Sequence, residues 1–227
     1  MSAPLPSALV AGLIPGCHLA QVTSVDDPLG LARVKVRLLA LDGDGHAEVW
    51  ARVALPFAGD NRGTFFIPDV GDEVLVSFIA GDPRFPIVLG GLWNGGAQPP
   101  DTIDSGGRNV RKVIRSKNGV KLTLDDTDGQ ERFIVETPGG QKVTLKDGPG
   151  AVTIEDSNGN SVKLETAGIT VTASAKVTVN ATQVSVSAGT VQVDAAMSSF
   201  SGIVRCDVLQ ATTVIATTYT PGAGNVW

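Results

Sequence analysis

The chain is poor in the residues that stabilise small secreted folds and membrane anchors. It has two cysteines, Cys17 and Cys206, in 227 residues, so no disulfide framework is expected and synthesis in a reducing cytoplasm fits. No stretch approaches the roughly 18 consecutive apolar residues of a transmembrane helix, and residues 1–10 have neither a charged leader nor a full apolar run. We therefore expect neither a signal peptide nor a membrane anchor.

An excess of basic charge is also missing. The formal net charge is −5: residues 1–100 carry six basic and ten acidic side chains, and the remainder carries twelve and thirteen. This balance argues against nucleic acid as a partner. One basic cluster stands out, which we interpret as a solvated or inter-chain ion-pairing collar. Its members are Arg108, Arg111, Lys112, Arg115 and Lys117.

Aromatic residues become scarce after residue 100, and this divides the chain into two parts. Seven of the eleven aromatic residues lie in residues 1–100. The first part is therefore expected to be globular, with an aromatic core around Trp50, Phe78 and Trp93. In the second part Thr, Val, Ser, Ala and Gly dominate, so something other than an ordinary core must hold it together.

Strand patterns run through the first part. Val34, Val36 and Leu38 alternate with basic residues, which predicts a strand with one wet face. Residues 74–79 and 87–92 are apolar on nearly all positions, and we expect buried strands that close a barrel. About five strands over residues 17–93, separated by Gly, Asp and Pro turns, fit a small OB-type barrel.

A repetitive segment follows a linker. The glycines and prolines of residues 94–107 suit neither a helix nor a central strand, so we place a domain boundary there. Beyond it, residues 118–124, 139–145 and 158–164 each consist of a Gly turn that leads into an alternating strand. Such repeats describe a stacked rod.

From residue 176 the repeat shortens to seven, and each unit carries two valines separated by two positions. That spacing puts the pair on one face of a strand but about 200° apart around a helix, which favours strands over a coiled coil. One such ribbon cannot bury its stripe or pair its edges alone. Three copies around an axis would form a triangular β-prism, although the repeat by itself does not fix the number three. The predicted trimer core comprises Val177, Val179, Val184, Val186, Val191 and Val193.

Candidate catalytic residues have simpler structural explanations. Cys17 and His18 would point to opposite faces of a strand, which argues against a thiol nucleophile beside its base. Residues 42–46, Asp-Gly-Asp-Gly-His, lack the further ligands of a calcium loop, and a hairpin turn is expected. The carboxylate pairs Asp125–Asp126 and Glu155–Asp156 are expected at solvated corners, splayed apart instead of facing each other across a sugar.

Phe65 and Phe66 could form the aromatic platform on which OB barrels stack nucleic acid or bind oligosaccharides. Core packing explains them more simply, and the acidic balance opposes nucleic acid. We therefore predict no catalytic residue, no metal ligand and no cofactor.

Five ordered motifs stand in the first part of the chain: Gly30–Val36, Trp50–Val53, Pro68–Val76, Gly81–Pro86 and Val88–Gly95. Together they resemble the OB domain of the phage baseplate assembly protein V and VgrG spike family. The tail, Tyr219-Thr220-Pro221-Gly222-Ala223-Gly224-Asn225-Val226-Trp227, looks like the blunt spike ends that accept a conical PAAR-repeat tip in that family.

The resemblance and the repeats together predict an all-β chain, with an N-terminal OB-fold barrel followed by an intertwined trimeric β-helix (β-prism) rod. The expected layout is an N-terminal arm (1–15), the OB-fold domain (16–95), a linker or collar (96–117), the trimeric β-helical spike (118–218) and a tip-docking segment (219–227).

The resemblance further implies a non-enzymatic central spike of a contractile tail or injection system, which punctures the target envelope mechanically. The implied partners are two further copies of the chain, a PAAR-repeat tip protein, the envelope transiently and a separate hub protein, because the chain begins almost at the barrel. Assembly into a phage tail, a tailocin or an extracellular injection particle is expected. A carbohydrate-binding trimeric fibre or adhesin and a β-helical glycan-degrading enzyme remain alternatives. An adhesin would be expected to show a binding patch on the rod, and an enzyme would need converging carboxylates.

Overall fold

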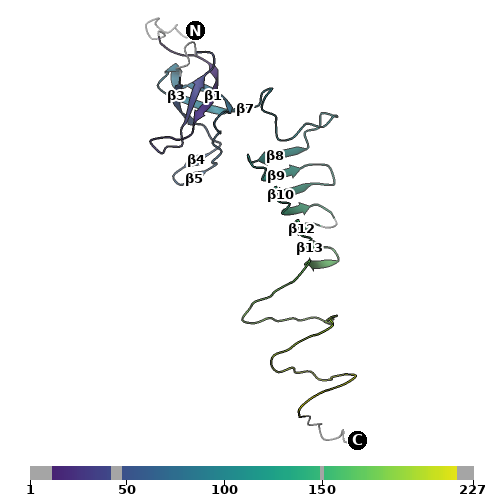
Figure 1. Ribbon diagram of the computed structural model, residues 1–227. Helices are drawn as coiled ribbons and strands as arrows, with labels where there is room; N and C mark the ends of the chain where they lie inside the picture. The colour runs from purple at the N-terminus through teal and green to yellow at the C-terminus, as the bar shows by residue number, and fades with distance from the viewer. Residues whose placement is uncertain (1–11, 42–47, 149–150, 219–227) are drawn as a thin grey trace. The chain divides into compact units, whose positions relative to one another are not determined.

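The computed structural model describes residues 12–41, 48–148 and 151–218, and these are almost entirely β or extended (Figure 1). The chain divides into two units, one up to Lys176 and one from Val177. The first unit contains a closed barrel and a long antiparallel sheet. No helix in the described part of the chain is long and apolar enough to cross a lipid bilayer.

Five strands close the barrel in the order β1-β2-β3-β7-β6, and every contact between neighbours is antiparallel except β3 with β7. A small hairpin of β4 and β5 lies between β3 and β6 in sequence, and one 3₁₀ turn follows β6. This arrangement confirms the expected OB-type barrel. The elements are β1 (Cys17–Ser24), β2 (Val34–Leu38), β3 (Glu48–Val53), β4 (Ala58–Gly59), β5 (Arg62–Gly63), β6 (Glu73–Phe78), η1 (Ile79–Gly81) and β7 (Pro86–Leu92).

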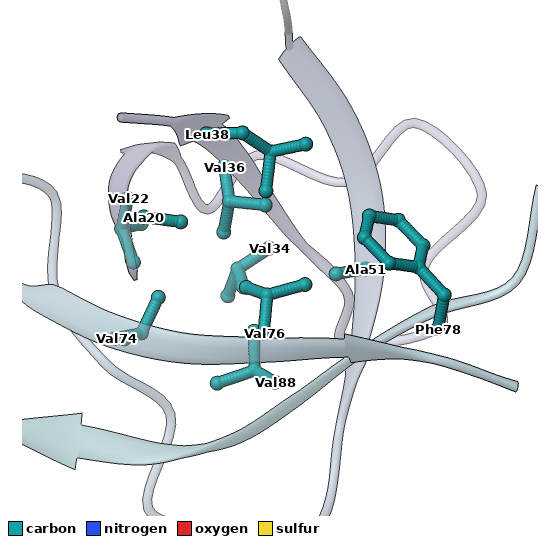
Figure 2. Packing of buried hydrophobic residues seen from close by; sticks show 10 residues of the cluster. All are labelled: Ala20, Val22, Val34, Val36, Leu38, Ala51, Val74, Val76, Phe78 and Val88. Atoms are coloured by element: carbon teal, nitrogen blue, oxygen red, sulfur yellow. The ribbon is translucent and has the colours of Figure 1, made fainter. Parts of the chain in front are cut away.

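The barrel core is built from valines on alternate strand positions, as period-two patterning requires (Figure 2). Val34, Val36 and Leu38 point inward from β2, as predicted. The strands β6 and β7 close the barrel as expected; within the chain β6 buries alternate positions along its length, and β7 buries Pro86 and Val88. The core residues are Ala20, Val22, Val34, Val36, Leu38, Ala51, Val74, Val76, Phe78 and Val88.

The expected aromatic core was wrong, because Phe78 is the one aromatic side chain among these buried residues. Trp93 is 69 % exposed. Trp50 is half-buried and lies under the Arg33 guanidinium, 5.5 Å from the ring centre. Small β-branched side chains fill a five-stranded barrel, so the large rings are left for its outer surface.

The turn between β1 and β2 explains the position of Arg33. Asp27 accepts hydrogen bonds from the backbone amides of Leu29, Leu31 and Arg33, and the Arg33 guanidinium lies 2.6 Å from its carboxylate. The Arg33 side chain, and then the three backbone amides, hold the pKa of Asp27 well below its usual range, although burial opposes them. The sequence motif Gly30–Val36 thus includes a pinned turn as well as a strand.

A seven-stranded antiparallel meander follows, with its strands in sequence order from β8 to β14 (Figure 1). Each strand pairs with the next through a short turn, which confirms the Gly-turn and strand repeats. β8 lies within residues 96–117, where a linker or collar was expected, and it pairs along its whole length with β9. Its three Arg and Lys residues do not give the apolar alternation from which the other strands were predicted. The strands are β8 (Arg111–Arg115), β9 (Lys121–Asp125), β10 (Arg132–Glu136), β11 (Lys142–Lys146), β12 (Val152–Glu155), β13 (Ser161–Glu165) and β14 (Gly168–Thr172).

Residues 177–218 of the second unit form an extended chain that runs back and forth without pairing to itself (Figure 1). Between Val177 and residue 218, which is the described part of this unit, no residue is assigned to a strand. The predicted strands of the seven-residue units therefore do not form within one chain. A strand needs a partner backbone to hydrogen-bond with, and in residues 177–218 no neighbouring pass of the same chain is paired as one.

Candidate assembly interface

One face of the meander carries two continuous apolar rows. Cross-strand pairs join Leu124 to Phe133 and Phe133 to Leu145, and the same register continues to β14. The first row is Leu124, Phe133, Leu145, Val152, Leu164 and Ile169, and the second is Ile114, Leu122, Val135, Val143, Ile154, Val162 and Val171. Alternation places both rows on the same face, which we call the apolar ladder.

The apolar ladder is not covered within one chain. Leu124, Leu145 and Ile154 are each close to half exposed, and Ile169 and Val171 at the end are more exposed still. A monomeric protein rarely exposes so continuous an apolar surface, and a sheet of this kind is stable when its apolar face packs against another layer. The face has the chemistry of an assembly interface.

The opposite face of the meander is polar and its charges are matched. Lys121 lies 3.8 Å from Glu136, and Lys142 lies 3.5 Å from Glu155, each across neighbouring strands. A central line of mainly threonines separates these pairs from the other strand ends. This face is suited to water, so the meander is amphipathic in the sense expected of a wall with one inner side.

Asp125 departs from the expected solvated corner. It is buried, and its carboxylate accepts hydrogen bonds from the hydroxyl and amide of Thr127 and from the Arg132 guanidinium at 3.0 Å. The Thr127 hydroxyl is the largest cause that lowers the pKa of Asp125, and Arg132 adds to it. Its neighbour Asp126 is exposed and faces Lys112 at 3.7 Å, so the pair does splay apart.

The second carboxylate pair is also structural. Asp156 closes the turn between β12 and β13 by accepting hydrogen bonds from the side chain and amide of Asn160 and from Asn158. These bonds, with the Asn160 side chain first, lower the pKa of Asp156 to about 2. Glu155 pairs with Lys142 on the polar face. The two carboxylates therefore serve different parts of the sheet.

The basic cluster forms ion pairs within the chain. Arg108 binds Asp104 and Arg111 binds Asp101, both at 2.9 Å, and Lys112 faces Asp126. A role in pairing between chains, which was the other part of the expectation, stays a prediction. Lys117 faces Asp69 at 3.4 Å, so four of the five basic side chains lie near a carboxylate of their own chain.

No candidate catalytic group converges with another in the described residues. Cys17 is exposed, whereas His18 turns the other way and meets Phe78 edge-on at 5.8 Å. No three His, Cys, Asp or Glu side chains between residues 12 and 41, 48 and 148 or 151 and 218 come together in a way that could hold a metal ion. Residues 42–46 and the tip-docking segment 219–227 lie outside the described residues.

The six predicted core valines are exposed in the single chain, with between 62 and 72 % of each residue accessible. Their inward position in a trimer stays a prediction. The sequence pattern did not predict the apolar ladder as a surface, although the alternation in residues 118–124, 139–145 and 158–164 indicated the apolar positions of its separate strands. Cross-strand register, which turns separate strands into rows, was the missing information.

Fold and surface together define a class: an all-β protein with an OB barrel and a sheet that needs partner chains. Residues 18–93 match the type VI secretion system/phage-baseplate injector OB domain, and residues 132–192 match the phage baseplate V C-terminal trimerisation domain. These two matches span more than half of the chain. The chain belongs to the phage baseplate V and VgrG spike family, and the second match supports a homotrimer.

Curated relatives agree with this assignment. The chain is 37 % identical over 97 residues to the type VI secretion system spike protein VgrG4b of Pseudomonas aeruginosa, which covers 41 % of the chain and 12 % of that protein. It is 34 % identical over 134 residues to spike protein VgrG5 of the same organism, covering 53 % and 17 %. The actin cross-linking toxin VgrG1 of Vibrio cholerae is 30 % identical over 97 residues, covering 40 % and 9 %. The chain thus matches less than a fifth of the length of these relatives.

Proposed function

We propose that the protein is the non-enzymatic central spike of a contractile tail or injection system, which links a hub to a PAAR-repeat tip and punctures the target envelope mechanically. The observation that carries this proposal is the apolar ladder. Three copies that turn their ladders to a common axis would form a closed prism, and the core valines of each chain would meet beyond it. The polar faces would then be outermost.

Such a prism has the mechanical property that puncturing needs. Removing one chain from it would break the packing and strand pairing with both neighbours before any part came free, which raises the barrier to unfolding under load. Force from a contracting sheath would therefore be transmitted to the target instead of unfolding the spike. Resistance to unfolding under load is the property that a spike protein of this family would need.

The barrel is the part that we expect to attach the spike to the hub. Because the barrel is closed and has its own buried core, a truncated chain that ends at Asn94 should fold and should still bind the hub protein. A pull-down with hub protein identified from purified sheathed particles measures this. If the hub binds only residues 95–227, the two ends of the spike have been assigned the wrong way round.

The segment Tyr219–Trp227 is the part that we expect to dock the PAAR protein. In a threefold rod its Tyr, Val and Trp side chains would be presented three times around the axis as a small apolar platform. Deleting residues 219–227 should leave the trimer and hub binding intact but abolish capture of the PAAR protein and puncturing activity. If the truncated trimer captures the PAAR protein as well as the full chain does, residues 219–227 are not the docking site.

A further inference from the structure

The barrel carries an exposed aromatic hairpin outside its five strands. Ala58 and Gly59 pair with Gly63 and Arg62 as β4 and β5. Three phenylalanines flank this hairpin, and Phe65 and Phe66 are 76 % and 63 % exposed. Core packing, the expectation for Phe65 and Phe66, was therefore wrong. Their exposure calls for another explanation, because large rings on a surface are favourable where a partner covers them.

A hollow of about 590 Å³ lies beside the hairpin. Its apolar lining includes Leu31, Leu55, Phe65 and Ile67, which come from the β1–β2 turn, the end of β3 and the hairpin itself. The hollow can therefore receive an apolar side chain, and the neighbouring rings extend the apolar surface. This arrangement, an indentation next to exposed aromatic anchors, is typical of a protein contact site.

Two arginines at the hollow have no partner in the described residues. Arg52 and Arg62 both line it, and neither makes an ion pair or a hydrogen bond there. Elsewhere on the barrel, Arg33 and Arg84 each lie 2.6 Å from a carboxylate of their own chain. A guanidinium group left open beside apolar surface suits a carboxylate supplied from outside.

Two features constrain the backbone of the hairpin. The Thr64 amide donates a hydrogen bond to the Phe57 carbonyl at 3.2 Å. Gly63 has a φ of 151°, and a Cβ there would lie 2.8 Å from that same carbonyl oxygen, so only glycine fits. A surface that is already ordered loses little conformational freedom on binding.

We propose that this surface, formed by Phe57, Phe65, Phe66, Arg52 and Arg62, docks an acidic, apolar segment of the hub protein. The inference rests on the proposed function and names the site and the chemistry of its partner. Nucleic acid is disfavoured, since residues 1–100 carry four more acidic than basic side chains.

The test measures binding of the full-length chain to the hub protein and to peptides tiled across the hub sequence, by fluorescence anisotropy. Phe65→Ala and Phe66→Ala should each weaken binding about tenfold or more, since exposed rings that become buried are typical hot spots. Arg52→Glu and Arg62→Glu should weaken it similarly and should reduce its salt dependence. The peptides that bind should contain acidic and apolar residues. Phe85→Ala and Arg84→Glu, exposed positions outside the hollow, are the matched controls and should bind as the unaltered chain does.

Each other outcome has a definite meaning. Hub binding that tolerates all four substitutions would overturn the docking site and leave the proposed function standing. Failure of the unaltered chain to bind any hub protein would overturn both. A loss of trimer mass in the four variants would assign the surface to contacts between copies, and binding of an oligosaccharide array through Phe65 and Phe66 would assign it to glycans. Either result would contradict the proposal.

Discussion

Phe133→Asp combined with Leu145→Asp should abolish the trimer. These residues face each other across β10 and β11 in the middle of the apolar ladder. In a trimer with the ladders inward, the change would place carboxylates from three chains in a dry interior with no counter-ion. Each buried unpaired charge costs several kcal/mol, so we expect no trimer at micromolar chain concentration in size-exclusion chromatography with light scattering.

A matched control exists on the other face of the same sheet. Thr153 and Thr170 both lie opposite Lys163 in the strand register, and Asp at either position would gain a cation. Thr153→Asp with Thr170→Asp should therefore leave the trimer intact. If the two double variants behave alike, the apolar ladder is not the inner face.

Val179→Asp, Val186→Asp and Val193→Asp together should prevent assembly of the rod. Within one chain these valines are exposed and their backbone has no strand partner, so their order depends on other chains. Hydrogen exchange of the amides of residues 177–193 should be slow in the unaltered protein and should approach the rate of an unstructured chain in the variant. The change should be at least about a hundredfold, because every amide that was paired becomes open to solvent.

Substitution of the intervening residues provides the comparison. Thr178→Asp, Ser185→Asp and Gln192→Asp alter the opposite side of the same strands and should leave exchange slow. Soluble trimers of the valine variant with protected amides would count against an inward valine stripe.

The sequence pattern predicted the strands of the barrel well, because the positions of its strands and turns are specified by residues close together in the chain. Alternation at Val34, Val36 and Leu38 specifies which face is buried, and the Gly and Asp turns specify where strands end. The size of the core side chains was not predictable in the same way. Trp50 and Trp93 are outside the core because a five-stranded barrel has room for valines, and that limit arises from closure of the sheet.

Features that depend on strand register or on other chains could not be predicted from the sequence pattern. Asp125 is buried because Arg132 on the next strand lies directly opposite it, a pairing that neither residue signals alone. Phe65 and Phe66 are exposed because their hairpin lies outside the barrel strands, although an apolar dipeptide in a globular domain usually packs inside. The valine repeat predicted partner chains, and the match of residues 132–192 to a trimerisation domain supports them, whereas the inward position of the six valines stays a prediction.

The particle mass of the full-length chain at nanomolar concentration tests the central claim most directly. A trimer of 23.4 kDa chains has a mass of about 70 kDa, and a closed prism whose chains share one apolar interior should not dissociate on dilution to this range. Mass photometry should therefore show a single species near that mass. A folded particle with the mass of one chain would contradict the account.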